Sequence, residues 1–156
     1  MSDVVIVTGG AIRIGREICL KLSEEGYKIA IHYRSSEGDA RDLQQEIESA
    51  GGNACTIQCD LNDSDSVKEL IKNASDSLGG VVGVVNNASL FVLDRIEDVS
   101  EEAWIEHMKV NALAPLLLIQ SLLESPVEGS WVVNILDFKV ESPNACLLYT
   151  SPSPRD

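Results

Sequence analysis

Short runs of consecutive apolar residues alternate along the chain with longer segments in which apolar residues recur every three or four positions. The run Val4–Val7 is apolar at every position, which is typical of a parallel strand that is buried on both faces. Further runs predict strands over residues 28–32, 54–58, 81–85 and 132–136.

Helices are predicted in the segments between these strands. Ile14, Ile18 and Leu22 recur as they would on one face of a helix, and Gly26 suits the position that ends it. Further helices are predicted from about Asp39 to Ala50, from a cap at Asp63 or Ser64 to about Leu78, and from Ser100 through Leu123. Strands that alternate with amphipathic helices predict a doubly wound α/β fold, with a parallel sheet of about five strands and helices on both faces.

Length and charge narrow the class of protein. The 156 residues suit a single domain with a sizeable core. The formal net charge is −13 and the basic residues form no cluster, which excludes a nucleic-acid partner. The chain has no apolar run long enough to span a membrane and no signal peptide pattern at its start. We therefore expect a cytoplasmic protein without a membrane partner.

The possible soft metal ligands are few and scattered, namely Cys19, Cys55, Cys59, Cys146, His32 and His107. A zinc site needs tighter clustering, so we expect no metal and interpret the cysteines as small buried residues in a reducing compartment. We interpret His107, in the long predicted helix, as a surface or interface residue.

Glycine or polar residues follow every predicted strand. They are Thr8, Gly9 and Gly10, then Tyr33, Arg34, Ser35 and Ser36, then Asp60, then Asn86 and Asn87, and lastly Asp137. Ligands of doubly wound sheets bind beyond the carboxyl ends of the strands, so these residues predict a ligand site there. The glycine turn after the first strand lets a phosphate approach the backbone and the N-terminus of the next helix.

The end of the second strand distinguishes two dinucleotide cofactors. A carboxylate there favours NAD, whereas a basic residue accommodates the 2′-phosphate of NADP. Here Arg34, Ser35 and Ser36 precede the first carboxylate, Glu37. We therefore predict NADP(H), with Arg13 in reach of the same phosphate. The alternative is that both arginines are simply solvated.

These motifs together resemble the short-chain dehydrogenase/reductase family over residues 3 to about 145. The glycine motif T-G-x-x-x-G-x-G of that family stands here as TGGAIRIG, and its N-N-A-G motif stands as NNAS. The resemblance implies a Rossmann domain and the cofactor-binding residues Thr8, Gly9, Arg13, Ile14, Gly15, Tyr33, Arg34, Ser35, Ser36, Asp60, Leu61, Asn87, Ala88 and Ser89. It also implies catalytic roles for Asn111 and Asp137, and a homo-oligomer, dimer or tetramer.

Three departures from the family pattern are similar to one branch, the pteridine reductases and related dihydrofolate and dihydromonapterin reductases. They are Arg13 for the middle glycine, Ser89 for the last glycine of N-N-A-G, and Asp137 where a serine usually stands. This resemblance implies NADPH-dependent reduction of a small pterin-like substrate. A 3-oxoacyl-carrier-protein type of carbonyl reductase is the alternative within the family. A non-catalytic dinucleotide-binding protein is the alternative of another class, and for Asp137 the alternative is a plain turn residue.

The end of the chain departs from the family. Counted from Asp137, the resemblance puts the catalytic tyrosine and lysine at positions 150 and 154, where this chain has Thr150 and Pro154. Residues 146–156 read, residue for residue, as the translation of a transposase-based sequencing-library adapter. We therefore expect residues 1–145 to be an incomplete NADP-binding domain, residues 146–156 to be a non-native tail, and the fragment itself to be inactive.

Overall fold

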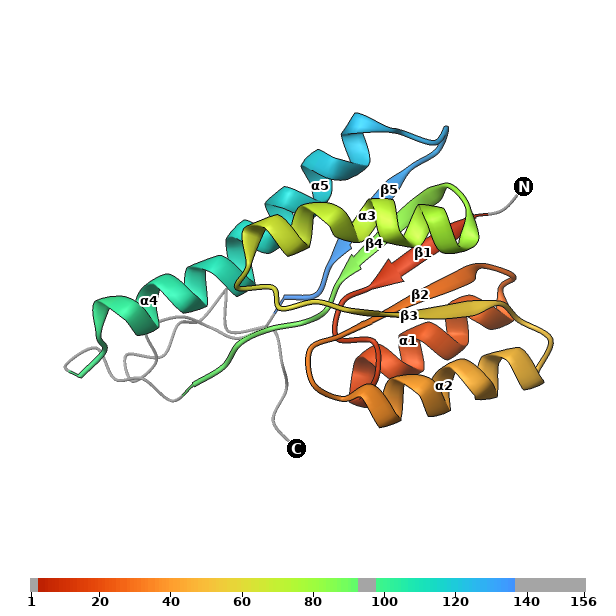
Figure 1. The fold of residues 1–156 in the computed structure, drawn as a ribbon, viewed down its shortest axis with the longest axis horizontal. Helices are drawn as coiled ribbons and strands as arrows, with labels where there is room; N and C mark the ends of the chain where they lie inside the picture. Colours follow the sequence, from red (N-terminus) through yellow and green to blue (C-terminus); the bar gives the residue numbers. More distant parts are fainter. Residues whose placement is uncertain (1–2, 93–97, 137–156) are drawn as a thin grey trace.

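A computed structural model describes residues 3–92 and 98–136 and contains a five-stranded parallel sheet between two layers of helices (Figure 1). The strands are β1 (Val4–Val7), β2 (Lys28–Tyr33), β3 (Ala54–Gln58), β4 (Val81–Asn86) and β5 (Trp131–Asn134). Their order in the sheet is β3-β2-β1-β4-β5, and every neighbouring pair is parallel. The order reverses between β1 and β4, which confirms the predicted doubly wound fold.

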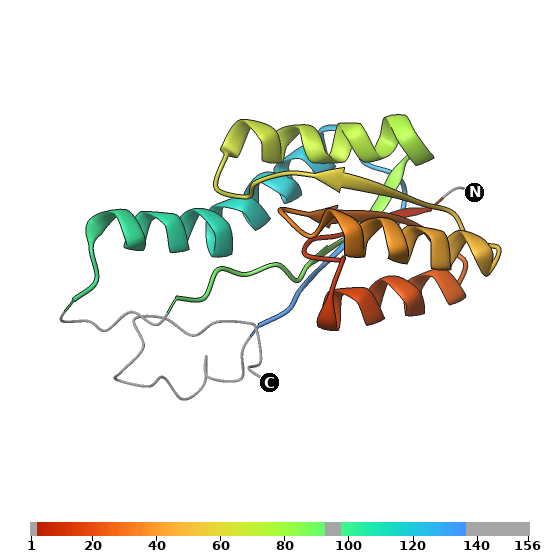
Figure 2. The same ribbon diagram turned by 60° about the horizontal axis from the view of Figure 1, so that its bottom comes forward.

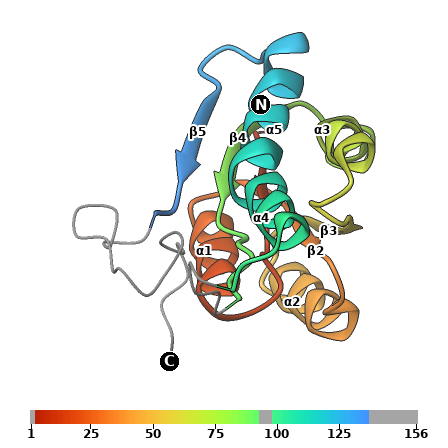
Figure 3. The same ribbon diagram turned by 90° about the vertical axis from the view of Figure 1, so that its left-hand side faces the viewer.

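The helices divide between the two faces of the sheet. They are α1 (Arg13–Glu24), α2 (Glu37–Ser49), α3 (Ser64–Leu78), α4 (Glu101–Met108) and α5 (Ala114–Glu124), with the π-helical segment η1 (Lys109–Leu113) between the last two. Figures 2 and 3 show α1 and α2 on one face, and α3 and α5 on the other. In Figure 1, α4 reaches beyond the carboxyl ends of the strands.

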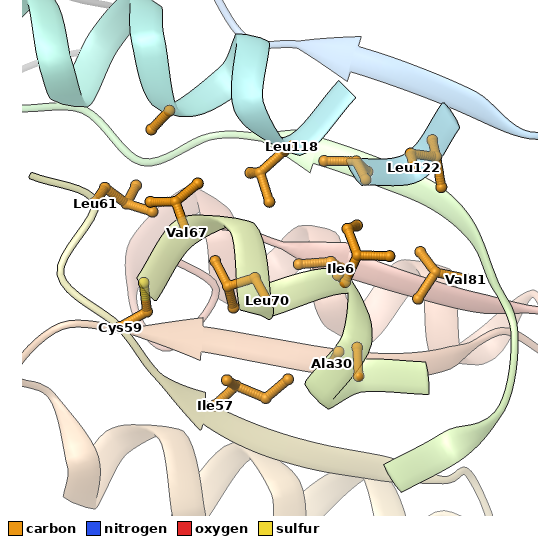
Figure 4. Packing of buried hydrophobic residues seen from close by; sticks show 14 of the residues in the cluster. Ile6, Ala30, Ile57, Cys59, Leu61, Val67, Leu70, Val81, Leu118 and Leu122 are labelled. Atoms are coloured by element: carbon orange, nitrogen blue, oxygen red, sulfur yellow. The ribbon is translucent and has the colours of Figure 1, made fainter. Parts of the chain in front are cut away.

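Each face of the sheet has its own apolar core, because successive side chains of a strand point to opposite faces. Val4 and Ile6 of β1 belong to the core beneath α3 and α5, which Figure 4 shows from close by. Val5 and Val7 belong to the core beneath α1 and α2. All four side chains are 0% exposed, so the continuous apolar run does correspond to a strand buried on both faces.

Two predicted helix caps are confirmed. The Asp63 carboxylate accepts a hydrogen bond from the N–H of Asp65 at 3.2 Å, and the Ser100 hydroxyl accepts one from Ala103 at 3.2 Å. Each satisfies a backbone donor that has no partner within its helix. The structure starts the second helix at Glu37, two residues before the predicted start, because Glu37 and Asp39 in its first turn suit the positive end of the helix dipole.

The buried face of α1 differs from the predicted one at its first position only, since Ile18 and Leu22 pack, partly buried, against the core beneath α1 and α2. Ile14 is 41% exposed, whereas Gly15 and Cys19 are the buried residues of this helix. A glycine and a cysteine face the sheet because the helix begins in direct contact with the turn after β1 and leaves no room for larger residues. Hydrophobic spacing alone could not reveal this contact.

The long predicted helix is present, but it is interrupted. Lys109–Leu113 forms a π-helical turn around Asn111, and α5 resumes at Ala114. Such wide turns occur frequently at functional sites. His107, at the end of α4, is only 2% exposed within the single chain, so the interpretation as a surface or interface residue was wrong.

Candidate functional site

A cleft opens at the carboxyl ends of the strands, where the sequence predicted a ligand site. The residues that line it are Gly9, Ala11, Ile12, His32, Tyr33, Arg34, Ser35, Ser36, Asp60, Leu61, Ala88, Ser89, Leu90 and Val110. They come from the ends of β1, β2, β3 and β4 and from η1. The cleft therefore lies at the point where the strand order reverses, as expected for this type of sheet.

The turn after β1 is packed so closely that glycine is required at two positions. Gly9 has a φ of +61°, and a Cβ atom there would come within 3.2 Å of the Ala88 Cα atom. A Cβ atom on Gly15 would overlap the carbonyl oxygen of Gly9. These contacts bring the start of α1, the turn and the segment after β4 together at one end of the cleft.

The N-terminus of α1 has the properties of an anion-binding site. The residue before the helix is Ile12, whose side chain lines the cleft and offers no oxygen to cap the first N–H groups. These donors and the helix dipole favour a negative group, such as a phosphate. Arg13, the first residue of α1, has a φ of +51°, a left-handed conformation that glycine adopts more readily.

Thr8 and Asn87 tie the ends of β1 and β4 together. The Thr8 hydroxyl oxygen accepts hydrogen bonds from the backbone N–H groups of Asn87 and Ala88, both at 3.0 Å, and donates to the Val85 carbonyl at 3.3 Å. In return, the Asn87 side-chain amide donates to the carbonyl oxygens of Thr8 at 3.0 Å and Gly9 at 3.2 Å. Both residues thus shape the cleft floor without lining it.

His32 joins three strand ends under the cleft. Its Nδ1 atom accepts a hydrogen bond from the Gly9 N–H at 3.0 Å, and its Nε2 atom lies 3.1 Å from the Cys59 carbonyl oxygen. The side chain is 2% exposed, and burial lowers the pKa of the imidazole from 6.5 to about 4, partly opposed by the hydrogen bond to Cys59 and the charge of Asp60. His32 is therefore neutral at physiological pH.

The segment after β2 presents a basic group to the cleft. Arg34 and Ser35 are exposed and Ser36 is half-buried. The Gln58 amide donates to the Arg34 carbonyl oxygen at 3.1 Å, which fixes the backbone of this segment against β3. The carboxylate of Glu37 pairs with Arg41 at 2.6 Å. Among the residues that the structure describes, no ion pair engages the Arg34 guanidinium, which suits it to meet an anionic ligand.

The segment after β3 contributes a carboxylate to the cleft. Asp60 accepts a hydrogen bond from the N–H of Asn62 at 2.9 Å through Oδ1, and its second oxygen is able to accept from a ligand. Leu61 is 7% exposed and lines the cleft beside it. An apolar wall with one acceptor suits an aromatic base that carries an amino group.

Asn111 fixes the segment that follows β4. Its side-chain Oδ1 accepts a hydrogen bond from the Leu90 N–H at 2.8 Å, and its Nδ2 donates to the Leu90 carbonyl oxygen at 2.9 Å. Leu90 and the neighbour Val110 both line the cleft. The π-helical turn is thus connected directly to the cleft wall.

The structure brings most of the predicted residues together, but not all. Arg13 and Ile14 line a separate shallow hollow along α1, with Glu17, Ile18 and Lys21. Asp137 lies outside the described residues. His32 was not among the predicted site residues, although a polar residue next to the apolar run Ile29–Ile31 of β2 is typical of a buried group with specific partners.

The two buried cysteines of the described residues are poorly suited to act as nucleophiles. Burial raises the pKa of Cys19 to about 12 and that of Cys59 to about 11, so both thiols stay protonated.

Within residues 3–92 and 98–136, no three or more Cys, His, Asp or Glu side chains are grouped so that they could hold a metal ion. Among the helices that the structure describes, none has both the length and the apolar character to cross a membrane.

Comparison with known proteins extends these observations. The family model of the short chain dehydrogenases matches residues 3–141. The 3-oxoacyl-[acyl-carrier-protein] reductase FabG of Staphylococcus epidermidis is 33% identical over 122 residues, which cover 78% of this chain and 50% of that protein. The chain spans about half the length of the curated relatives it matches.

The fold of this chain is also similar to solved structures of proteins bound to NADP or NADPH. FolM alternative dihydrofolate reductase 1 from Brucella canis, complexed with NADP, has a TM-score of 0.86 and 35% identity over 96% of this chain and 58% of that one. A blue fluorescent protein from a metagenomic library, in complex with NADPH, has a TM-score of 0.86 and 33% identity over 90% of this chain and 57% of that one.

Proposed function

Since the chain belongs to the short-chain dehydrogenase family, we propose that it forms the cofactor-binding part of an NADPH-dependent oxidoreductase. The observation that carries this proposal is the placement of Arg34, Ser35 and Ser36 along the cleft, while Glu37, the first carboxylate after them in the chain, is paired with Arg41. A guanidinium and two hydroxyl groups suit the 2′-phosphate that distinguishes NADP from NAD.

The cleft fits the rest of the dinucleotide. Asp60 and Leu61 would hold the adenine. The N-terminus of α1, which packs against Gly9, would hold the phosphates. Ala88 and Ser89, after β4, would contact the part of the cofactor that reacts. The cofactor-bound relatives FolM and the metagenomic fluorescent protein support this assignment.

When bound, NADPH supplies a hydride to the substrate. Asn111 would act by holding the Leu90 segment against the cleft, and Asp137 would orient the substrate. In this chain positions 150 and 154 hold Thr150 and Pro154, and with Asp137 they lie outside the described residues. We propose that the tyrosine and lysine of the family belong to a longer parent protein, and that this chain binds cofactor without turnover.

For the substrate of the parent protein, we propose a pterin-like ring with a C=N bond. The similarity to FolM supports this choice, as do the three departures at Arg13, Ser89 and Asp137. The FabG relatives support a second candidate, a carbonyl group on an acyl-carrier thioester, at comparable identity. A dinucleotide-binding protein without catalysis is the remaining candidate, and it would bind cofactor but reduce neither substrate.

Cofactor choice is tested by titrating this chain with NADPH and with NADH in a calorimeter. We expect NADPH to bind more tightly, because a charge-assisted pair with a phosphate contributes about 1.5–3 kcal/mol, or roughly 10–100-fold in affinity. Arg34→Ala should remove this preference and leave NADH affinity unchanged. Lys72→Ala, a change of an exposed basic residue of α3 that pairs with Asp76 and does not line the cleft, serves as the control. Equal affinity of the unaltered chain for both cofactors would refute the proposal.

The parent protein is tested separately. Sequencing of the source DNA across the codon for Ala145, with primers outside the library adapters, should show a reading frame that continues to a tyrosine at 150 and a lysine at 154. The recovered enzyme should then oxidise NADPH with dihydropterin or dihydrofolate faster than with a 3-oxoacyl thioester. A native stop after Asp156 would instead favour the non-catalytic alternative.

A further inference from the structure

His32 holds both N–H groups of the glycine turn that begins the proposed cofactor site. The Gly9 N–H donates to the imidazole Nδ1 at 3.0 Å, and the Gly10 N–H donates to the His32 carbonyl oxygen at 2.9 Å. One residue of β2 therefore engages two consecutive donors of the turn after β1. A phosphate must consequently use later donors, at the start of α1.

The hydrogen bonds of the imidazole require one protonation state. A backbone N–H only donates, so Nδ1 must carry a lone pair. A carbonyl oxygen only accepts, so Nε2, which faces the Cys59 carbonyl at 3.1 Å, must carry the proton. The ring is thus the neutral Nε2–H tautomer, and both of its polar atoms are satisfied although it is 2% exposed.

The two partners of the ring follow or end the two strands that flank β2 in the sheet, β1 and β3. Gly9 lies in the turn that leads to α1, where the phosphates are proposed to bind. Cys59 immediately precedes Asp60, the proposed partner of the adenine. The rigid imidazole therefore sets the separation between the phosphate-binding turn and the base-binding wall.

We propose that His32 is a positioning residue for cofactor binding, which acts by holding the Gly9 turn through its Nδ1 atom. This inference rests on the proposed NADP(H) binding and adds a residue to that site. His32 donates nothing to the cofactor itself; it holds the backbone in the conformation that admits the phosphates. A side chain that only filled space would contribute to stability and leave the affinity of the folded protein unchanged.

Three substitutions separate these roles. His32→Asn places an amide oxygen near the position of Nδ1, so it keeps the acceptor for Gly9 and loses the link to Cys59. His32→Gln places an amide N–H near the position of Nε2, so it keeps the link to Cys59 and loses the acceptor for Gly9. His32→Leu loses both. Leu122→Ala, in the other core beneath α5, is the control for a change that destabilises the fold away from the cleft.

The measurement is the affinity for NADP⁺ by calorimetry, at a temperature where each variant is folded by circular dichroism. We expect His32→Asn to stay within about threefold of the unaltered chain, and His32→Gln and His32→Leu to lose about tenfold or more. Leu122→Ala should lower the melting temperature without changing the affinity. Unchanged affinity in His32→Leu, or an equal loss in His32→Asn and His32→Gln, would overturn the inference.

Nitrogen NMR of the imidazole tests the geometry without cofactor. We expect Nε2 to be protonated and Nδ1 to be bare at neutral pH, and the Gly9 amide to exchange slowly with solvent except in His32→Gln and His32→Leu. A protonated Nδ1 would overturn the inference whatever the affinities are. If the unaltered chain shows the expected tautomer but binds no NADP⁺, the proposed function fails, and the positioning role fails with it.

Discussion

The side-chain amide of Asn111 bonds both backbone polar groups of Leu90, although the two residues stand 21 positions apart. The acceptor bond is 2.8 Å long and the donor bond is 2.9 Å long. The π-helical turn Lys109–Leu113 includes Asn111, and Leu90 lines the cleft. The wide turn and the cleft wall are therefore coupled through a single side chain.

Asn111→Ala should remove both of these hydrogen bonds. We expect it to lower the free energy of unfolding by about 1–3 kcal/mol, because two partly buried backbone groups lose a partner. Urea unfolding followed by circular dichroism measures the change. Gln120→Ala, an exposed substitution in α5, is the control and should stay within about 0.5 kcal/mol. Equal stability of the two variants would mean that the contact contributes nothing.

Thr8→Val should leave the N–H groups of Asn87 and Ala88 without their acceptor. Threonine and valine have the same shape, so the substitution changes hydrogen bonding and little else. We expect a loss of about 2–4 kcal/mol in urea unfolding and faster amide exchange at both N–H groups. Thr8→Ser keeps the hydroxyl and should cost less than half as much; if serine is as harmful as valine, the hydroxyl is not the cause.

Gly15→Ala should be strongly unfavourable, because the new Cβ atom would overlap the Gly9 carbonyl oxygen. We expect it to cost about 1–3 kcal/mol and to abolish cofactor binding, since the turn must move. Gly38→Ala, in α2, is the matched control, because the described residues leave open space within 4 Å of its Cβ position. That variant should be more stable by about 0.4–1 kcal/mol. Melting curves of both variants test the contrast.

His32 should make stability depend on pH in a defined window. Burial lowers its folded-state pKa from 6.5 to about 4, so the unfolded chain binds a proton that the folded chain does not. The stabilisation is complete above the unfolded value and is lost as pH falls from about 6.5 to about 4, in total about 3 kcal/mol. Urea unfolding across this range should show the slope, and His32→Asn should flatten it. A slope that persists in His32→Asn would assign it to the carboxylates instead.

Local patterns predicted much of this fold. The strands Val4–Val7 and Ala54–Gln58 have the predicted bounds, and Asp63 and Ser100 cap their helices as expected. These features depend on residues within a few positions of one another, so a sequence read in order reveals them. The doubly wound order of the sheet follows, because right-handed crossovers leave few other arrangements.

The position of the candidate site could be predicted from the sequence, but most of the contacts within it could not. The strand ends pointed to Arg34, Ser35 and Asp60 because parallel strands present their carboxyl ends at one edge. The role of His32 and the exposure of Ile14 were not apparent, because each depends on atoms that the chain brings together from distant positions.

The sequence by itself determined which residues form strands and helices, and that their polar ends converge. Only the tertiary structure decided which of these polar groups face the cleft and which hold it in shape. Thr8 and Asn87 are hydrogen-bonded to each other, and Asn111 is hydrogen-bonded to Leu90, across separations of 79 and 21 residues. Hydrogen bonds of this kind depend on distances of about 3 Å between atoms, and only the packing of β1, β4 and the π-helical turn sets those distances.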